Sequence, residues 1–120
     1  MADEPLLFTC AHGPDDPERA TVPFILAATA AIAGQKVIVV CTVDGSWMGT
    51  ERIHEVQEDG FPPAADLRKT LIEAGGELWV CGACASKRKI TGDDTSEGCT
   101  IVGAATIVEA LVNGKAFTAA

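Results

Sequence analysis

Short apolar runs alternate with helical segments along this chain, and the alternation constrains its fold more than any other feature. The run Val37-Ile38-Val39-Val40-Cys41 is continuously apolar and β-branched, which is typical of a parallel strand covered on both faces. Strands and helices in regular alternation indicate an α/β protein with a doubly wound sheet. We therefore expect three layers, α/β/α, around an open, mostly parallel sheet of about five strands.

Apolar patterning and capping residues assign the individual elements. The expected strands are Leu6–Cys10, Lys36–Val43, Glu77–Cys81, Thr100–Val102 and Ala116–Thr118. The expected helices are Pro17–Ala33, Ala64–Ala74, Ala83–Lys89 and Gly103–Val112. Residues 46–63 form a long irregular connection, with a helical turn expected around Glu51–Glu58.

The first helix is apolar on nearly every side. Asp16 caps its start, Pro17 occupies its first position and Gly34 follows its end. Phe24 lies on one face, and Leu26 lies on an opposite face that is almost as apolar. A helix of this kind is buried on more than one side. We therefore expect a subunit interface at this helix, and a homo-oligomer.

Length and charge exclude several classes of protein. The 120 residues are enough for one well-packed domain and too few for two, so we expect a single domain over residues 1–120. A net charge of −8 disfavours a nucleic-acid-binding surface. The longest apolar block, Val22–Ala33, is too short to span a bilayer, so we expect no membrane span. No glycine-rich phosphate loop follows the first strand, and we predict no cofactor.

The five cysteines indicate reduced thiols. Their odd number and irregular spacing argue against the disulfide framework of a secreted protein. The acidic start, Met1–Pro5, lacks the cationic and apolar stretches of a signal peptide. We therefore expect a cytoplasmic protein.

The motif Cys81-Gly82-Ala83-Cys84 is the strongest candidate for chemistry. It follows a buried strand and begins a helix, and the cations Lys87, Arg88 and Lys89 come next. The free N–H groups at a helix start and nearby positive charge both favour the thiolate. The thiolate is the nucleophilic form of cysteine, so Cys81 and Cys84 are the candidate catalytic residues.

The predicted topology divides the cysteines into groups. Cys10, Cys41 and Cys81 each close a strand, and ligands of open α/β sheets bind outside these carboxyl ends. Cys41 follows an unbroken valine run and is expected to be a buried apolar residue. Cys10 remains a supporting candidate. Cys99 precedes its strand and should lie at the opposite edge.

Four stretches resemble the DsrE/DsrF/TusD-like family of small sulfur-relay-type α/β proteins. They are Gly13–Thr21, Gly34–Val40, Cys81–Ile90 and Ile101–Ala104, and their order and spacing carry the likeness. The likeness extends over nearly the whole chain. It implies the DsrE/DsrF-like fold, which is flavodoxin-like in appearance.

The resemblance also implies a function. In that family a cysteine that closes the third strand carries sulfur as a persulfide, and a basic residue follows six or seven positions later. Cys81 has that position here, Lys87 and Arg88 have those offsets, and Cys84 matches a second cysteine of some members. The family implies a sulfurtransferase-like carrier whose partners are sulfur donor and acceptor proteins or small thiols. It also implies trimers or hexamers.

Other functions fit parts of the same pattern. The pair Cys81 and Cys84 is also typical of thiol–disulfide oxidoreductases, but thioredoxins need a later proline and none follows Pro63. Cys10 and His12, supporting residues at the same predicted edge, would complete a set of soft ligands for zinc. One close pair is weaker than the two pairs of strong zinc motifs, so we predict no metal.

The long connection after the second strand suggests a last alternative. Asp44, Ser46 and Trp47 follow that strand directly and lie near the same edge. They would form the floor of a small-molecule pocket. In that case the protein would be a non-catalytic oligomeric subunit.

Overall fold

Five parallel strands form the centre of the computed structural model, which describes residues 4–118. The strands are β1 (Leu6–Cys10), β2 (Val37–Cys41), β3 (Glu77–Cys81), β4 (Cys99–Val102) and β5 (Lys115–Thr118). Their order is β4-β3-β2-β1-β5, and every neighbouring pair is parallel. From β1 the chain therefore adds β2, β3 and β4 in turn toward one edge of the sheet, and β5 then pairs with the other side of β1. The predicted open parallel sheet is confirmed.

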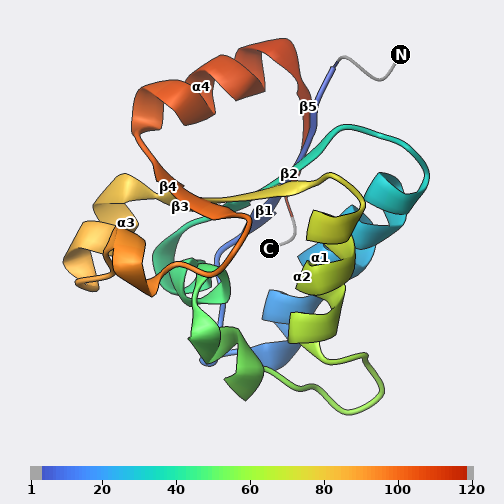
Figure 1. Ribbon diagram of the computed structural model, residues 1–120, viewed down its shortest axis with the longest axis vertical. Helices are drawn as coiled ribbons and strands as arrows, with labels where there is room; N and C mark the ends of the chain where they lie inside the picture. Colours follow the sequence, from blue (N-terminus) through green and yellow to red (C-terminus); the bar gives the residue numbers. More distant parts are fainter. Residues whose placement is uncertain (1–3, 119–120) are drawn as a thin grey trace.

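Helices cover both faces of this sheet. The described residues form α1 (Pro17–Ile32), α2 (Ala64–Glu73), α3 (Gly82–Lys87) and α4 (Ala104–Asn113). Figure 1 shows α1 and α2 on one face, α4 on the other, and α3 near the ends of β3 and β4. This is the predicted three-layer arrangement. None of these helices has both the length and the apolar character that a membrane crossing requires.

The sheet separates a larger core from a smaller one. Phe24 and Leu78 belong to the larger core, beneath α1 and α2. Ile38 and Val40 belong to the smaller core beneath α4, together with the partly buried Trp79. All five residues of β2 are buried, alternately on the two faces. The continuous apolar run of β2 is therefore explained by cover on both sides.

The capping residues fix the ends of α1. The Asp16 side chain accepts a hydrogen bond from the backbone N–H of Arg19 at 3.2 Å, and Pro17 is the first helical residue. Gly34, just beyond the end, has a φ of +92°. One side of α1 packs on the sheet and another packs against α2. The sequence predicts a subunit interface because α1 is apolar on nearly every side. Packing on the sheet and on α2, within one chain, buries most of this apolar surface. The large apolar side chains of α1 that stay exposed are Leu26 and Ile32.

The connection between β2 and α2 is more regular than its sequence indicates. Two 3₁₀ helices, η1 (Val43–Gly49) and η2 (Glu51–Glu55), occupy it, where one helical turn is expected. A third, η3 (Gly92–Asp94), lies in the loop before β4. Arg68 on α2 fixes the junction of η1 and η2, because its Nη1 donates to the carbonyls of Met48 and Thr50, at 3.0 Å each. η1 is thereby held at the carboxyl ends of the central strands, against α3.

Candidate functional site

The two cysteines of the CxxC motif lie where β3 ends and α3 begins. Leu78 and Val80 are buried in the core and fix the strand. Cys81 is the last residue of β3 and the N-cap of α3, and Cys84 follows in the first turn of the helix. Both cysteines are free thiols and both are half-buried. The motif therefore presents two neighbouring sulfur atoms at the carboxyl edge of the sheet.

The surroundings of Cys81 favour its thiolate. Its pKa lies below the ordinary value of a cysteine thiol, chiefly because the backbone N–H of Cys84 hydrogen-bonds to its sulfur. Partial burial opposes this effect, while the Cys84 thiol and the N–H of Ala83 reinforce it. These N–H groups are available because the first turn of a helix has no internal acceptor for them. The lowered pKa favours Cys81 as a nucleophile for chemistry on sulfur near neutral pH.

The sulfur of Cys84 is contacted from η1. It accepts a hydrogen bond from the backbone N–H of Val43, at 3.1 Å. Val43 has a φ of +51°, a left-handed conformation that is costly for a β-branched residue. The backbone thus adopts an unfavourable conformation at the point where it contacts the thiol pair. The sequence contains no sign of this contact.

Arg88, expected to support the Cys81 thiolate, instead pairs with an acid. Its Nη2 lies 3.1 Å from Oδ1 of Asp44, and its Nη1 donates to the carbonyl of Cys84 at 3.2 Å. The guanidinium therefore holds α3 against η1. Lys87 is exposed at the last residue of α3. The lowered pKa of Cys81 has its causes in two N–H groups and the neighbouring thiol, and these cations are not among them.

Cys10 ends its strand as predicted, but its side chain belongs to the core. Cys10 is in register with Cys41, and Cys41 with Val80, and all three are buried beneath α1 and α2. Residues in register on parallel strands point to the same face, and successive residues alternate between faces. Cys81, the residue after Val80, therefore points away from them. The expectation that Cys10 joins the site is wrong, whereas the buried position expected for Cys41 is confirmed.

Burial also suppresses the reactivity of two other cysteines. It raises the pKa of Cys41 well above the ordinary value, and the neighbouring Cys10 adds to this shift. It also raises the pKa of Cys99. Cys99 begins β4 in register with Leu78, whereas Val102 at the other end of β4 is in register with Cys81. Cys99 thus lies at the opposite edge, as the sequence predicts.

His12 belongs to the structure of the loop after β1. Its Nδ1 lies 2.9 Å from Oδ2 of Asp15, and the other oxygen of that carboxylate accepts from the N–H of Gly13 at 2.7 Å. Cys10 beside it is buried, so the zinc set considered from the sequence does not assemble. Residues 4–118 contain no group of three or more His, Cys, Asp or Glu side chains placed to hold a metal ion.

Two cavities flank Trp47, beside the pair formed by Asp44 and Arg88. One cavity has a volume of about 330 Å³ and is lined by Asp44. The other has a volume of about 420 Å³ and is lined by Arg88. The guanidinium of Arg52 lies 4.7 Å above the ring of Trp47 and borders both. Asp44 and Trp47 thus line cavities at this edge as expected. Ser46 does not, because it is fully buried.

Comparison with solved structures shows the fold. The ychN protein from E. coli superposes with a TM-score of 0.80 at 14% identity, covering 97% of this chain and 99% of that one. A protein of unknown function from Methanobacterium thermoautotrophicum superposes with a TM-score of 0.73 at 17% identity, covering 98% of this chain and 100% of that one. At these identities the likeness concerns the fold alone.

Sequence comparison shows the family. An uncharacterised protein of Methanopyrus kandleri is 30% identical over 87 residues, which are 72% of this chain and 69% of the relative. A longer one from Methanocaldococcus jannaschii is 27% identical over 100 residues, 82% of this chain and 36% of the relative. Residues 5–118 match the family model of DsrE/DsrF-like proteins. Because this match spans nearly the whole chain, the protein belongs to the DsrE/DsrF-like family.

Proposed function

We propose that this protein carries sulfane sulfur as a persulfide on Cys81. The observation that carries the proposal is the position of Cys81 at the end of β3, half-buried, with its pKa lowered by the N–H groups of α3 and by the adjacent thiol. Attack on sulfur needs a thiolate and access to it. Membership of the DsrE/DsrF-like family supports the same reading, because the family resemblance assigns the persulfide to this position.

The loading step is a thiol exchange. The Cys81 thiolate attacks the outer sulfur of a donor persulfide R–S–SH. The S–S bond of the donor breaks, the donor leaves as the thiolate R–S⁻, and Cys81 becomes Cys81–S–SH. An acceptor thiolate then attacks the outer sulfur of Cys81–S–SH and takes it, and Cys81 leaves as the thiolate. The step needs no outside oxidant, because one S–S bond replaces another.

Cys84 provides a second route for the bound sulfur. Its sulfur adjoins that of Cys81 and accepts the N–H of Val43. Attack of the Cys84 thiolate on the inner sulfur forms a Cys81–Cys84 disulfide, and the outer sulfur leaves with the electron pair as hydrosulfide. A reducing thiol then restores the dithiol. In this scheme Cys84 is a resolving thiol, and Cys81 is the carrier.

Mass spectrometry after incubation with a small-molecule persulfide tests the proposal. The wild-type protein should gain the mass of one sulfur atom, located on the peptide that contains Cys81. In Cys84→Ala the adduct should persist longer and release less sulfide, because the resolving thiol is absent. A Cys84→Ala protein that gains no sulfur in this experiment contradicts the proposal, because no resolving thiol could then have removed the adduct.

Thiol–disulfide exchange is a second candidate, and the contact between the Cys81 and Cys84 thiols favours it. Two adjacent thiols can close to a disulfide and pass the two electrons to another disulfide. Reduction of insulin disulfides distinguishes the two functions. Catalytic turnover there, with no sulfur adduct, would replace the carrier by an oxidoreductase.

We also propose that the protein is a homo-oligomer, associated through α4 and β5. Val108, Leu111 and Val112 on α4, and Phe117 on β5, are exposed large apolar side chains, with Val112 78% exposed. Exposed apolar patches mark interaction sites more often than isolated residues do. Sedimentation should show a mass above that of the monomer for wild type and a shift toward monomer for Val112→Asp. Thr106→Asp, a change of equal charge elsewhere on α4, should leave the mass unchanged; a monomeric wild type contradicts the proposal.

A further inference from the structure

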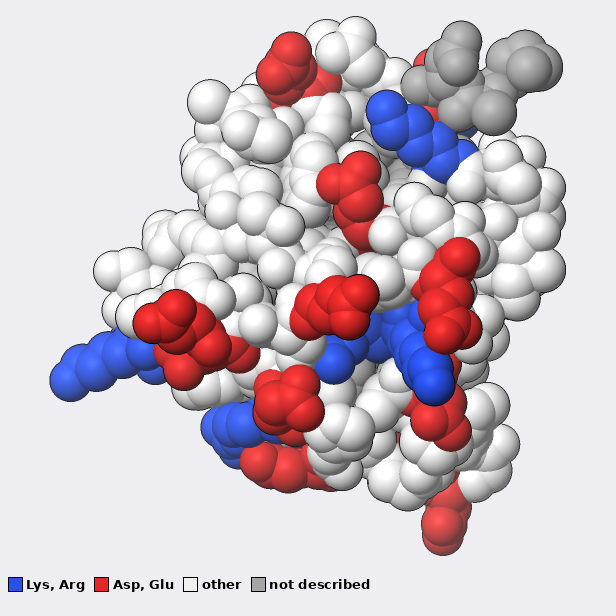
Figure 2. Space-filling view, viewed as in Figure 1, with Lys and Arg blue, Asp and Glu red and all other residues white. Residues whose placement is uncertain are grey.

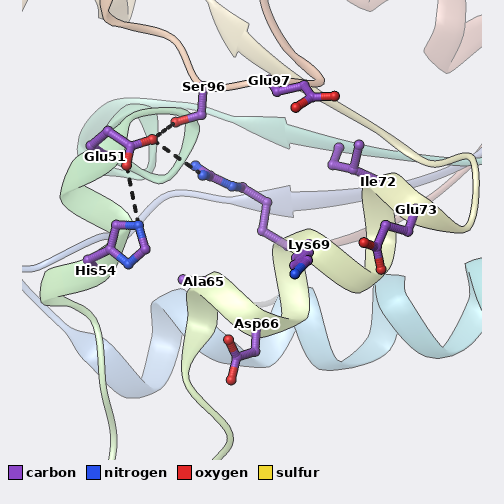
Figure 3. Close-up of a pocket in the computed structure, with 10 residues that line it drawn as sticks. Glu51, His54, Ala65, Asp66, Lys69, Ile72, Glu73, Ser96 and Glu97 are labelled. Carbon is purple, nitrogen blue, oxygen red and sulfur yellow. Dashed lines mark hydrogen bonds and ion pairs between the residues drawn. The ribbon is translucent and has the colours of Figure 1, made fainter.

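A cavity of about 380 Å³ lies between α2, η2 and the loop that leads into β4. Figure 3 shows its labelled residues on these three segments. Neither Cys81 nor Cys84 lines it. It lies beside the residues that precede β4, whereas the thiol pair lies at the end of β3. The proposed sulfur chemistry therefore leaves this cavity without a role.

Arg68 forms the inner wall of the cavity. It is only 9% exposed, and both hydrogen bonds of its Nη1 go to the carbonyls of Met48 and Thr50. Among residues 4–118, Nε has no hydrogen-bond partner, and the nearest acid to Nη2, Glu51, is 3.9 Å away. Arg68 and Glu51 both line the cavity, and the ion pair between them is long.

This geometry suits a carboxylate. Nε and Nη2 of arginine form a planar fork that matches the two oxygens of a carboxylate. Nη1 is already fixed by two carbonyls, so the fork is held in one orientation before a ligand arrives. Lys69 adds a second cation to the wall. A buried guanidinium whose Nη2 has only a long ion pair is stabilised further when a closer acceptor binds.

The wall of the cavity also carries three acids. Asp66 and Glu73 lie on α2, as Arg68 does, and Glu97 lies in the loop before β4; Figure 3 labels all three. Figure 2 shows acidic side chains spread over this view of the molecule, and the net charge of the chain is −8. A ligand with several negative charges would be repelled by this field. A ligand with one carboxylate and one ammonium group matches both kinds of charge in the wall.

We propose that this cavity binds a free amino acid or a similarly small zwitterion. Its carboxylate lies on the Nε and Nη2 edge of Arg68, and its ammonium group lies among Asp66, Glu73 and Glu97. Ile72 and Ala65 supply apolar surface for the rest of the ligand. The volume falls in the range of about 300–1,000 Å³ that is usual for small-molecule sites.

Glu51 competes with the ligand for Arg68. Its carboxylate accepts a hydrogen bond from Ser96 Oγ at 2.7 Å and lies 3.3 Å from Nε2 of His54. The Ser96 hydroxyl is the main cause that lowers the pKa of Glu51, with Arg68 and His54 contributing. Glu51 thus faces Arg68 as a carboxylate at neutral pH. Removing this charge should strengthen the binding of a ligand carboxylate.

Isothermal titration calorimetry with each of the common L-amino acids, one at a time, tests the proposal. At least one should bind saturably, with one molecule per chain, at submillimolar to millimolar concentration. Its methyl ester and its N-acetyl derivative should each bind about tenfold more weakly or worse, because each loses one charge-assisted contact. Glu51→Gln should bind the free amino acid more tightly than wild type.

Variants of the cavity wall separate this site from any other. Arg68→Gln should lose binding, but this change also removes the donor to two buried carbonyls. The double variant Glu73→Gln and Glu97→Gln therefore tests the acids of the wall with exposed residues alone, and should weaken binding. Glu109→Gln on α4 is the matched control and should bind like wild type. Cys81→Ser should also bind like wild type, so the outcome is independent of the sulfur chemistry.

Three results would overturn the proposal. The first is the absence of saturable binding for every amino acid at millimolar concentration. The second is an ester that binds as tightly as the free acid, because the ligand carboxylate would then have no partner. The third is binding that neither Glu51→Gln nor the double variant changes, which would place the ligand elsewhere.

Discussion

Replacing Cys81 by serine should abolish sulfur loading while leaving the fold intact. Serine differs from cysteine by one atom, and Cys81 is half-buried at a strand end, so the packing changes little. The hydroxyl does not ionise near neutral pH, and it therefore cannot replace the thiolate as a nucleophile. After incubation with a persulfide donor, mass spectrometry should find no added sulfur on the peptide that held Cys81. Far-ultraviolet circular dichroism should match wild type.

Cys99→Ser is the control for this experiment. Cys99 is buried at the opposite edge, and burial raises its pKa. This variant should load sulfur on Cys81 as wild type does. If Cys81→Ser loads as much sulfur as wild type on another cysteine, the assignment of the carrier is wrong.

Replacing Gly45 by alanine should destabilise the protein and disturb the site. A Cβ at Gly45 would overlap the backbone carbonyl of Cys10, which already accepts a hydrogen bond from the N–H of Thr42 at 2.9 Å. The carbonyl of Cys10 and the N–H of Thr42 are backbone groups, so neither can move away from the new Cβ without shifting η1. We expect the free energy of unfolding to fall by about 1–3 kcal/mol, as measured by chemical denaturation. Val43 and Asp44, the neighbours of Gly45, should lose their contacts with α3.

Gly92→Ala provides the matched comparison. No atom lies within 4 Å of a Cβ built at Gly92, so this change should alter stability by less than about 0.5 kcal/mol. An equal effect of the two substitutions would show that the close approach of Gly45 to Cys10 does not limit stability.

The sequence predicts the sheet well because the signals for its elements are local. Leu6–Cys10 and Glu77–Cys81 are strands at the predicted bounds, and Val37–Cys41 is the core of the second predicted strand, Lys36–Val43. Asp16 and Pro17 fix the start of α1 by hydrogen bonding and by backbone preference, which depend on neighbouring residues only. The 3₁₀ helices η1 and η2 have no such signal. Long-range packing on Arg68 holds them in place.

The candidate site is predicted less completely because it depends on register and on distant partners. The sequence places Cys10 and Cys81 at one edge, but only the register shows that their side chains point to opposite faces. Arg88 pairs with Asp44, 44 positions away, and no local pattern indicates this.

Arg68 is not among the residues predicted from the sequence, although its position on α2 contains a signal for it. It lies on α2, three residues before Leu71 and four after Ala64, and both of these are buried. Residues three and four apart share one face of a helix. A charged residue at such a position needs polar partners inside the protein, and it is therefore a candidate for a binding site.

The pH dependence of Cys81 alkylation tests the central claim most directly. Because a lowered pKa keeps the thiolate populated at lower pH, the alkylation rate should rise to half its maximum below about pH 8.5, the ordinary value of a cysteine thiol. Iodoacetamide labelling of wild type, with peptide mapping to separate Cys81 from Cys84, gives this rate. A midpoint below about 8.5 for Cys81 agrees with a thiolate stabilised by the N–H groups of α3. A midpoint at or above that value would contradict it.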